Sequence, residues 1–462
     1  MWVKRDKTGI ALAIWVRNVH STGPQRAQPS LDAYAAADRL RGKLTRQMPM
    51  KRRVLVIQPD LGPSGGGNAV AACLIEALKS ENAISALSWT SPDIDAMNRF
   101  FATSLKPSDF TAHSAPLFLR VLVKLNPYLS PLRYGILLRL CKRMRNDYDI
   151  MISVNNEADF GCKGIQYVHD PPYWFYHVYG KPRPGIRLLF PHHLWAVFKG
   201  KHRPWMLIAG FSYDRMKENI SLVNSDWTGM KLKEVYGIES TTVYPPILGS
   251  FPQVPWEDRE NGLVCIGRIS PWKNLEKIIE ITEAVRSKVP DTHLHIVGTT
   301  GRERGYLEGL FRMVRDSSWI LVNENVSREE LVHLITSHRY GIHGMVDEPF
   351  GIAVAEMVHG GCIVFVPRNA GPMEIVGGDD RLLYGTTEEA VRKIVHVMSS
   401  PDEQTSLCSY LNSRGDLFSK ERFMYRIQQI VRQFPERIPS STHEASSYQQ
   451  ITSNPLVAGH DP

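Results

Sequence analysis

Two glutamates stand eight residues apart in the stretch DEPFGIAVAEMVHGG, which covers residues 347–361. Proline suits the first position of a helix, so the stretch predicts a helix that begins at Pro349 and runs to the glycine pair at its end. Eight helical residues rise by about 12 Å, which is too far for Glu348 and Glu356 to act as an acid/base pair. Two carboxylates at this spacing instead suit a ligand that carries hydroxyl groups at two places.

Two cations follow a predicted strand in the stretch CIGRISPWKN, where Arg268 and Lys273 precede a helix expected to start at Asn274. Ligands of open α/β sheets lie at the carboxyl ends of strands. An arginine fork and a lysine point charge at such a place suit a diphosphate. A nucleotide-sugar has hydroxyls on both sides of its diphosphate, so Glu348 would accept from the sugar and Glu356 from the ribose.

A glycine-rich loop, QPDLGPSGGGNAV, follows the first predicted strand, and Gly65, Gly66 and Gly67 open the next helix. Glycines at this place let backbone amides approach a phosphate at a helix N-terminus. The loop has neither the GxGxxG pattern nor the GK[ST] of a Walker loop, which weakens the dinucleotide and ATPase interpretations. A plain strand-to-helix turn is the alternative.

The composition bounds the class of protein. The chain has 462 residues, of which 43% are hydrophobic and 22% charged, so two domains of ordinary size are expected. No apolar run approaches the roughly 18 residues of a membrane-spanning helix, so we expect no segment that crosses a membrane. The six cysteines are scattered without a CxxC pair, which favours reduced core thiols in a cytosolic protein.

The positive charge belongs to the first residues. Residues 1–53 carry a net charge of +9, whereas the rest of the chain carries −1. We interpret residues 1–50 as a basic arm that is disordered or precedes the true start, since Met48 and Met50 offer later starts. A functional basic arm is the alternative, and a secretory signal is disfavoured because no small-residue cleavage site follows closely.

From residue 51 onward, short β-branched runs alternate with helix-like segments, which is typical of parallel α/β units. We predict two Rossmann-like, doubly wound domains at 51–249 and 263–415, joined by a linker at 250–262. A terminal helix is expected at 416–435 and a disordered tail at 436–462. The predicted strands are RVLVIQPD, YDIMISVN, GIQYVHD, ISLVNS and TTVYPP in the first domain, and GLVCIGRI, THLHIVG, WILVNENV, YGIHG, CIVFVP and RLLYG in the second.

Five motifs in the same order resemble those of the retaining glycosyltransferases of family 4. They are QYVHDPP, LVNSDWT with VYPPI, GRISPWKN, EPFGIAVAE and GCIVFVPRNAGPMEIV. The resemblance covers roughly residues 52–435. It implies the α/β GT-B fold, in which two Rossmann-like domains face each other across a cleft.

The resemblance also implies roles for single residues. Arg268 and Lys273 would bind the donor diphosphate, Glu348 the transferred sugar and Glu356 the ribose, while His169 would lie near the donor sugar. These implications give the catalytic set His169, Arg268, Lys273 and Glu348. The donor-binding set is Gly65, Gly66, Gly67, Arg268, Lys273, Glu348, Phe350, Gly351, Ile352 and Glu356.

No metal and no cofactor are predicted. Asp93 and Asp95 form a DID pattern, but they lie outside any glycine-rich loop and read as surface polar residues. The sequence offers no carboxylate nucleophile beside the donor site. We therefore expect front-face attack, in which the departing diphosphate, stabilised by Arg268 and Lys273, helps to take the acceptor proton.

Two stretches of the first domain combine apolar or aromatic residues with basic ones, at 115–149 and 173–206. Such a mixture, with Arg139, Lys142 and Arg143 in the first stretch, favours the surface of an anionic membrane. Packing in the domain core and stacking on RNA are the alternatives. We expect a cytoplasmic protein at the cytosolic face of a membrane, with a glycan or lipid-linked acceptor and no nucleic acid.

The expected activity is transfer of a hexose from a nucleotide-diphosphate sugar. The glycine-rich first loop is similar to that of mannosyltransferases acting on lipid-linked oligosaccharides, which makes mannose the candidate sugar. The alternatives are a sugar-nucleotide epimerase or a phosphorylase of the same fold, or a non-catalytic binder of sugar nucleotides or nucleic acid. The donor base, the acceptor and the linkage stay open.

Overall fold

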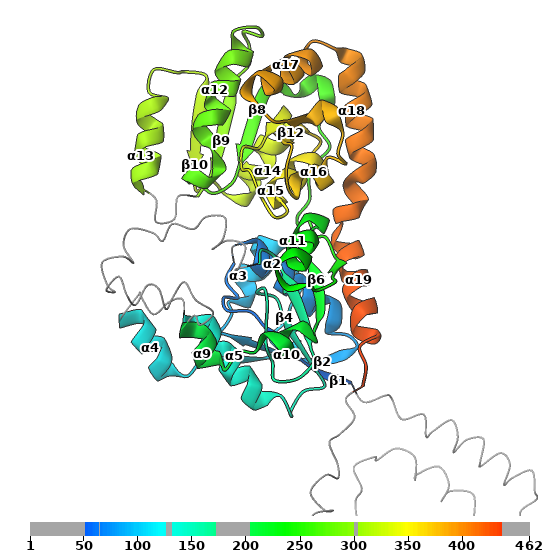
Figure 1. Cartoon of the computed structure of the whole chain (residues 1–462). Helices are drawn as coiled ribbons and strands as arrows, with labels where there is room; N and C mark the ends of the chain where they lie inside the picture. Colours follow the sequence, from blue (N-terminus) through cyan, green and yellow to red (C-terminus); the bar gives the residue numbers. More distant parts are fainter. Residues whose placement is uncertain (1–50, 64, 126–131, 172–203, 300–303, 437–462) are drawn as a thin grey trace, which may run out of the picture. The chain divides into compact units, whose positions relative to one another are not determined.

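The computed structural model describes residues 51–63, 65–125, 132–171, 204–299 and 304–436 (Figure 1). The described residues from Arg52 onward belong to one unit of the chain. The predicted basic arm, nearly all of the predicted tail and most of the aromatic stretch at 173–206 lie outside these residues.

The first sheet is parallel, with the strand order β3-β2-β1-β4-β5-β6-β7. Its strands are β1 (Arg52–Ile57), β2 (Asn82–Ser88), β3 (Phe110–Ser114), β4 (Ile150–Ser153), β5 (Ile165–Val168), β6 (Ile220–Val223) and β7 (Thr241–Thr242). Every predicted strand of this half is present. β2 and β3 were not predicted, because NAISALS is rich in small residues and FTAHS is a mostly exposed edge strand.

The second sheet is also parallel, with the order β10-β9-β8-β11-β12-β13. Its strands are β8 (Glu260–Ile266), β9 (Leu294–Gly298), β10 (Ile320–Glu324), β11 (His338–Ile342), β12 (Ile363–Pro367) and β13 (Leu383–Tyr384). All six runs predicted for this half are strands. Both sheets reverse their strand order beside the first strand, so their ligand crevices are expected between β1 and β4 and between β8 and β11.

Helices lie between most of the strands along the described chain. In the first half they are α2 (Gly66–Leu78), α3 (Ile94–Phe101), α4 (Leu117–Leu125), α5 (Leu132–Met144), α9 (Pro204–Ala209), α10 (Tyr213–Lys217) and α11 (Asp226–Tyr236). In the second half they are α12 (Leu275–Arg286), α13 (Arg304–Met313), α14 (Arg328–Ser337), α15 (Ile352–His359), α16 (Pro372–Ile375), α17 (Thr387–Met398), α18 (Pro401–Arg414) and α19 (Lys420–Arg432). Short 3-10 turns are η2 (Trp256–Asp258), η3 (Pro271–Lys273), η4 (Asp380–Leu382) and η5 (Gly415–Phe418).

Helix starts agree with the side chains that precede them. Ser327 and Thr386 each accept a hydrogen bond from the amide three residues later, at 3.1 and 3.2 Å, as the capping-box spacing predicts. Asp93 of the DID pattern likewise caps α3 by accepting from the amide of Ala96 at 2.9 Å. That carboxylate therefore has a structural partner at a helix start.

The terminal helix α19 packs against α2, which belongs to the first half of the chain. Phe423, Ile427 and Val431 are buried in the same apolar core as the first sheet. The guanidinium of Arg52 donates to the carbonyls of Val431 and Phe434, at 3.0 and 2.7 Å. The core of the first half therefore includes residues from the far end of the sequence.

One basic side chain expected at a membrane is engaged inside the protein. Lys142 of α5 donates to the Asp159 carboxylate at 2.8 Å and to the carbonyl of Gly210 at 2.6 Å. Asp159 is fully buried, and Lys142 neutralises it together with Arg215. The prediction that Lys142 faces lipid was wrong, because a buried carboxylate requires a charged partner.

All six cysteines are described and none forms a disulfide, in agreement with the prediction of reduced thiols; Cys73, Cys141, Cys265 and Cys362 are buried. Within the described ranges, no helix has both the length and the apolar character needed to span a membrane.

Candidate functional site

A small pocket lies at the carboxyl ends of β8 and β11, where the second sheet reverses its strand order. Gly267, Arg268 and Lys273 line it from the loop after β8, and His343 and Gly344 line it from the end of β11. This is the edge at which open α/β sheets bind ligands. The pocket thus brings together the two predicted cations from CIGRISPWKN and a histidine that the sequence analysis did not select.

The loop after β8 presents its two cations differently. Arg268 is exposed, and its guanidinium has no hydrogen bond or ion pair within the described parts of the chain. Lys273 ends the turn η3 and is partly buried, and its ammonium donates to Oε2 of Glu348. The side-chain Nδ2 of Asn274 donates to the carbonyl of Gly344 at 2.9 Å, which joins the two loops of the crevice. Helix α12 starts at Leu275, one residue after the predicted start.

Glu348 lies beside both Lys273 and His343. Its Oε2 contacts Lys273 and lies 3.6 Å from Nε2 of His343. Burial raises the pKa of this carboxyl, but the positive charge of Lys273 opposes it and leaves the pKa below its ordinary value. Glu348 is therefore an ionised hydrogen-bond acceptor, as binding of sugar hydroxyls requires.

His343 is fully buried beside Glu348, and its Nε2 finds no hydrogen-bond partner among the described residues. Burial, and then the positive charge of Lys273, lower the pKa of His343 to about 4. The imidazole is therefore neutral near pH 7. A polar atom that is buried without a partner is costly, so a ligand that supplied one would be stabilised here.

The carboxyl of Asp170 is close enough to this carboxylate to be affected by its charge. Burial, and then the negative charge of Glu348, raise the pKa of Asp170 to about 6. Its amide and that of His169 donate to Oδ1 of Asn156, at 3.0 and 2.8 Å. Asp170 was not among the site residues predicted from the sequence. The QYVHDPP motif that ends β5 thus supplies a carboxyl group to the surroundings of Glu348.

His169 lies beside the glycine-rich loop. A Cβ placed on Gly67 would be 3.5 Å from Nε2 of His169. The same Nε2 lies 3.0 Å from the carbonyl of Val154, and because a carbonyl can only accept, Nε2 carries the hydrogen. Burial lowers the pKa of His169 to about 4, so its imidazole is neutral near pH 7 and its Nδ1 can accept.

The glycine-rich loop takes a backbone shape that suits glycine. Gly65 caps α2 with a φ of 94°, and a Cβ on Gly66 would lie 2.4 Å from Cδ1 of Ile352. The predicted donor-binding residues Gly66 and Ile352 are therefore in contact, although 286 positions separate them in the sequence.

The helix in the two-glutamate stretch begins later than predicted. Gly351 caps α15 with a φ of 94°, and the helix starts at Ile352 rather than at Pro349. A left-handed residue interrupts a helix, so residues 348–350 form a loop and the distance of about 12 Å does not apply. A Cβ on Gly351 would lie 3.2 Å from Cγ of Pro372. Both the positive φ and this close approach therefore favour glycine at position 351.

This loop is held by two other motifs. The hydroxyl of Ser225, in LVNSDWT, donates to the carbonyl of Pro349 at 2.5 Å. The amide of Gly371, in NAGPMEIV, donates to the carbonyl of Glu348 at 3.0 Å. Glu374 of the same motif accepts from the amides of Asp226 and Trp227, at 2.9 and 2.8 Å. Motifs that are distant in sequence thus fix the backbone that presents Glu348.

Two predicted donor-binding residues have protein partners. Phe350 is buried and stacks on Tyr244, with ring centroids 5.9 Å apart, so its side chain belongs to the core. Oε1 of Glu356 accepts from Arg328 at 2.6 Å. A ribose bound at Glu356 would share this carboxylate with Arg328.

The two parallel sheets are those of the GT-B fold, as predicted. The structure of Anabaena HepE in complex with UDP and glucose has the same fold, with a TM-score of 0.57 at 13% identity, over 82% of this chain and 99% of that one. Residues 230–413 match the family model described as glycosyl transferases group 1. The matched region contains Arg268, Lys273 and Glu348, and it ends before α19.

Curated relatives match a smaller part of the chain. A Dictyostelium discoideum protein named GDP-Man:Man(3)GlcNAc(2)-PP-Dol alpha-1,2-mannosyltransferase is 26% identical over 234 residues, which are 46% of this chain and 46% of that protein. The Homo sapiens protein of the same name is 25% identical over 228 residues, 44% of this chain and 46% of its own length. The chain thus spans less than half the length of these relatives.

Proposed function

We propose that the protein is a glycosyltransferase that transfers a hexose from a nucleotide-diphosphate sugar. The observation that carries the proposal is the crevice between β8 and β11, where Arg268 and Lys273 line the pocket and an ionised Glu348 pairs with Lys273. The match of residues 230–413 to the group 1 glycosyl transferases supports it independently of the geometry. Mannose from GDP-mannose is the candidate donor, because the curated relatives are named for it.

The proposed reaction is a retaining, metal-independent transfer of the family 4 type. The bond from the anomeric carbon to the diphosphate oxygen breaks, and a bond to the acceptor oxygen forms on the same face of the sugar. The acceptor proton passes to the departing diphosphate. Arg268 and Lys273 act where negative charge develops on that diphosphate, and Glu348 accepts from sugar hydroxyls.

The neighbours of Glu348 shape this role. Lys273 holds Glu348 ionised, so the lysine already shares its charge between the carboxylate and any diphosphate. Arg268, which has no partner among the described residues, can give its whole fork to the diphosphate. We therefore assign the larger share of the charge stabilisation to Arg268.

The acceptor is proposed to be lipid-linked and reached at a membrane surface. The curated relatives carry a PP-Dol acceptor in their names. Helix α4 exposes an apolar face that includes Phe118 and Leu125, 71% and 78% exposed, and Lys124 adds an exposed positive charge. An apolar face beside basic residues is typical of helices that lie on anionic membranes.

The test is a donor panel with one matched pair of variants. GDP-mannose should raise the melting temperature more than UDP-glucose, UDP-galactose or ADP-glucose, because a ligand stabilises the state that binds it. Arg268→Ala should lower turnover by about 100- to 1000-fold. Its stability should change by at most about 0.5 kcal/mol, because the side chain is exposed and unbonded.

Arg312→Ala is the matched control, since Arg312 is an exposed arginine on α13 outside the crevice. It should keep its full turnover. Near-normal turnover of Arg268→Ala would refute the assignment of the crevice. Conversion of the donor with no acceptor present would indicate an epimerase instead.

A further inference from the structure

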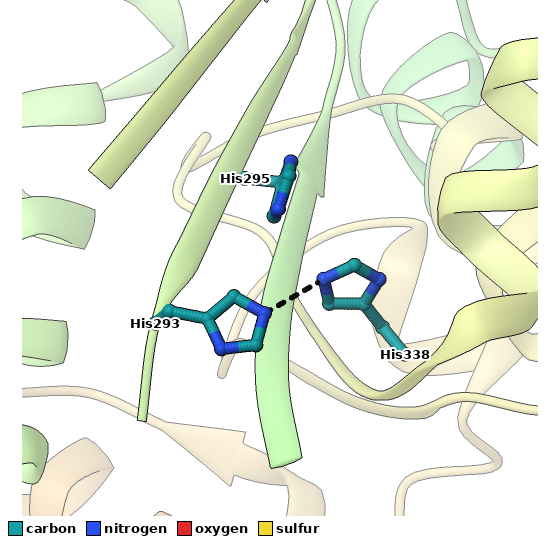
Figure 2. Close-up of side chains that lie close together, drawn as sticks. All are labelled: His293, His295 and His338. Atoms are coloured by element: carbon teal, nitrogen blue, oxygen red, sulfur yellow. Dashed lines mark hydrogen bonds between the residues drawn. The ribbon is translucent and has the colours of Figure 1, made fainter. Parts of the chain in front are cut away.

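Three histidines gather at the amino ends of the second sheet's strands, opposite the crevice (Figure 2). His293 directly precedes β9, and His295 lies two residues later, so both point to the same face of the sheet. His338 is the first residue of β11. One ligand atom from each ring can be chosen so that all three lie within 4.8 Å of one another.

Two of these rings are oriented by hydrogen bonds that leave Nε2 unprotonated. Nδ1 of His338 lies 2.7 Å from the carbonyl of Leu334, and Nδ1 of His295 lies 3.1 Å from Oδ1 of Asn323. Both oxygens can only accept, so each Nδ1 carries the hydrogen. This is the arrangement by which proteins orient histidines that bind metals through the other nitrogen.

The distances within the cluster suit a tetrahedral ion. Nε2 of His293 lies 3.1 Å from Nε2 of His338, the contact dashed in Figure 2. The same Nε2 lies 3.2 Å from Oε2 of Glu260. Bonds of about 2.0–2.1 Å to a central zinc ion would place neighbouring ligand atoms about 3.3 Å apart. Two edges of the tetrahedron therefore exist already, and the widest pair of nitrogens would need to close by at most about 1.5 Å.

The surrounding backbone leaves room for this arrangement. β8 lies between β9 and β11, and Glu260 pairs with His338 across the two strands. A Cβ on Gly262 of β8 would lie 2.3 Å from Nε2 of His293, so only a glycine accommodates the ring in this position. His338 also follows the last residue of α14, and the carbonyl end of a helix favours positive charge.

We propose that His293, His295, His338 and Glu260 form a structural binding site for a divalent cation of the zinc class. Three imidazole nitrogens and one carboxylate oxygen suit Zn²⁺ in tetrahedral geometry. β11 separates His338 from His343 of the crevice by five residues, or about 16 Å. An ion at this end joins β8, β9 and β11 and takes no part in the transfer. No metal was predicted from the sequence, because only the Asp93 and Asp95 pattern was weighed there and it was interpreted as surface polar residues.

The site is tested by titrating the chelator-treated full chain with Zn²⁺. Calorimetry measures the binding, and the melting temperature is compared with and without the ion. Co²⁺ serves as a second probe, because its visible absorption distinguishes tetrahedral coordination. We expect one ion per chain and a higher melting temperature when the ion is bound.

Four variants complete the test. His293→Gln should weaken binding by more than about 100-fold, since it removes a ligand, and Asn323→Ala by about 10- to 100-fold, since it removes the orienting partner of His295. His293 is chosen because its ring is partly exposed, whereas loss of the buried His338 could unfold the chain. Glu260→Gln should also weaken binding, and His396→Gln, an exposed histidine on α17, should leave it unchanged.

Equal Zn²⁺ affinity in the wild type and His293→Gln would overturn the proposal, as would the absence of binding near pH 7. Either result would leave the three rings as packed side chains joined by a hydrogen bond. Because the site lies at the other end of the strands, either result is independent of donor binding in the crevice.

Discussion

The carboxyl of Asp170 should make the stability of the protein depend on pH. The ordinary pKa of an aspartate carboxyl is 3.8, and the pKa of Asp170 in the folded protein is about 6. The folded state therefore binds this proton more tightly than the unfolded state. The stabilisation is fully present below about pH 4 and is lost as pH rises through about 6.

The magnitude follows from the size of the shift. A rise from 3.8 to about 6 corresponds to about 3 kcal/mol at most. Because Asp170 is partly exposed, water screens part of this effect, and we expect about 1–2 kcal/mol. Asp170→Asn imitates the protonated form, so it should match the wild type near pH 4 and be more stable by this amount near pH 7.

Urea unfolding at several values between about pH 4 and pH 7 measures the effect as a difference between the two proteins. Glu348→Gln should shrink the difference, because it removes the negative charge that raises the pKa of Asp170. Asp291→Asn, at an exposed aspartate before β9, is the control and should follow the wild type at every pH. Parallel curves for wild type and Asp170→Asn would refute the reasoning.

Two further predictions concern the loop and the membrane. Gly371→Ala would place a Cβ 2.2 Å from the carbonyl oxygen of Pro349, so it should lower the free energy of unfolding by about 1–3 kcal/mol and weaken donor binding. Gly305→Ala, with open space around it, is the control and should do neither. Unchanged donor binding in Gly371→Ala would contradict the role given to the loop that presents Glu348. Phe118→Ser combined with Leu122→Ser should reduce sedimentation of the protein with anionic vesicles, whereas Met230→Ser, at an exposed residue of α11, should not. Equal sedimentation of the double variant and the wild type would show that α4 does not contact the membrane.

The elements that the sequence predicted well are those with strong local signals. Buried parallel strands such as VLVI and CIVFVP are apolar on both faces, and the serine and threonine caps are local hydrogen bonds. The start of α15 failed for an equally local reason. The proline suggested a first helical position, but the left-handed backbone of Gly351 delays the helix, and a glycine alone does not reveal its φ.

The site was predicted only in part, because its chemistry depends on residues brought together by the fold. The loop after β8 was found because two cations follow one strand. His343 and Asp170 each stand alone in the sequence, and only the meeting of β5, β8 and β11 with Glu348 gives them a role. The same limit hid the cluster at His338, whose partners lie on other strands.

The packing of α19 has a consequence for synthesis on the ribosome. The first sheet ends at β7, yet Phe423, Ile427 and Val431 complete its core. About 190 residues separate β7 from the end of that helix, which takes about 10–40 s to translate at 5–20 residues per second. For that time the apolar face of α2 stays uncovered on the nascent chain, and it exposes surface of the kind that chaperones bind until α19 has been synthesised.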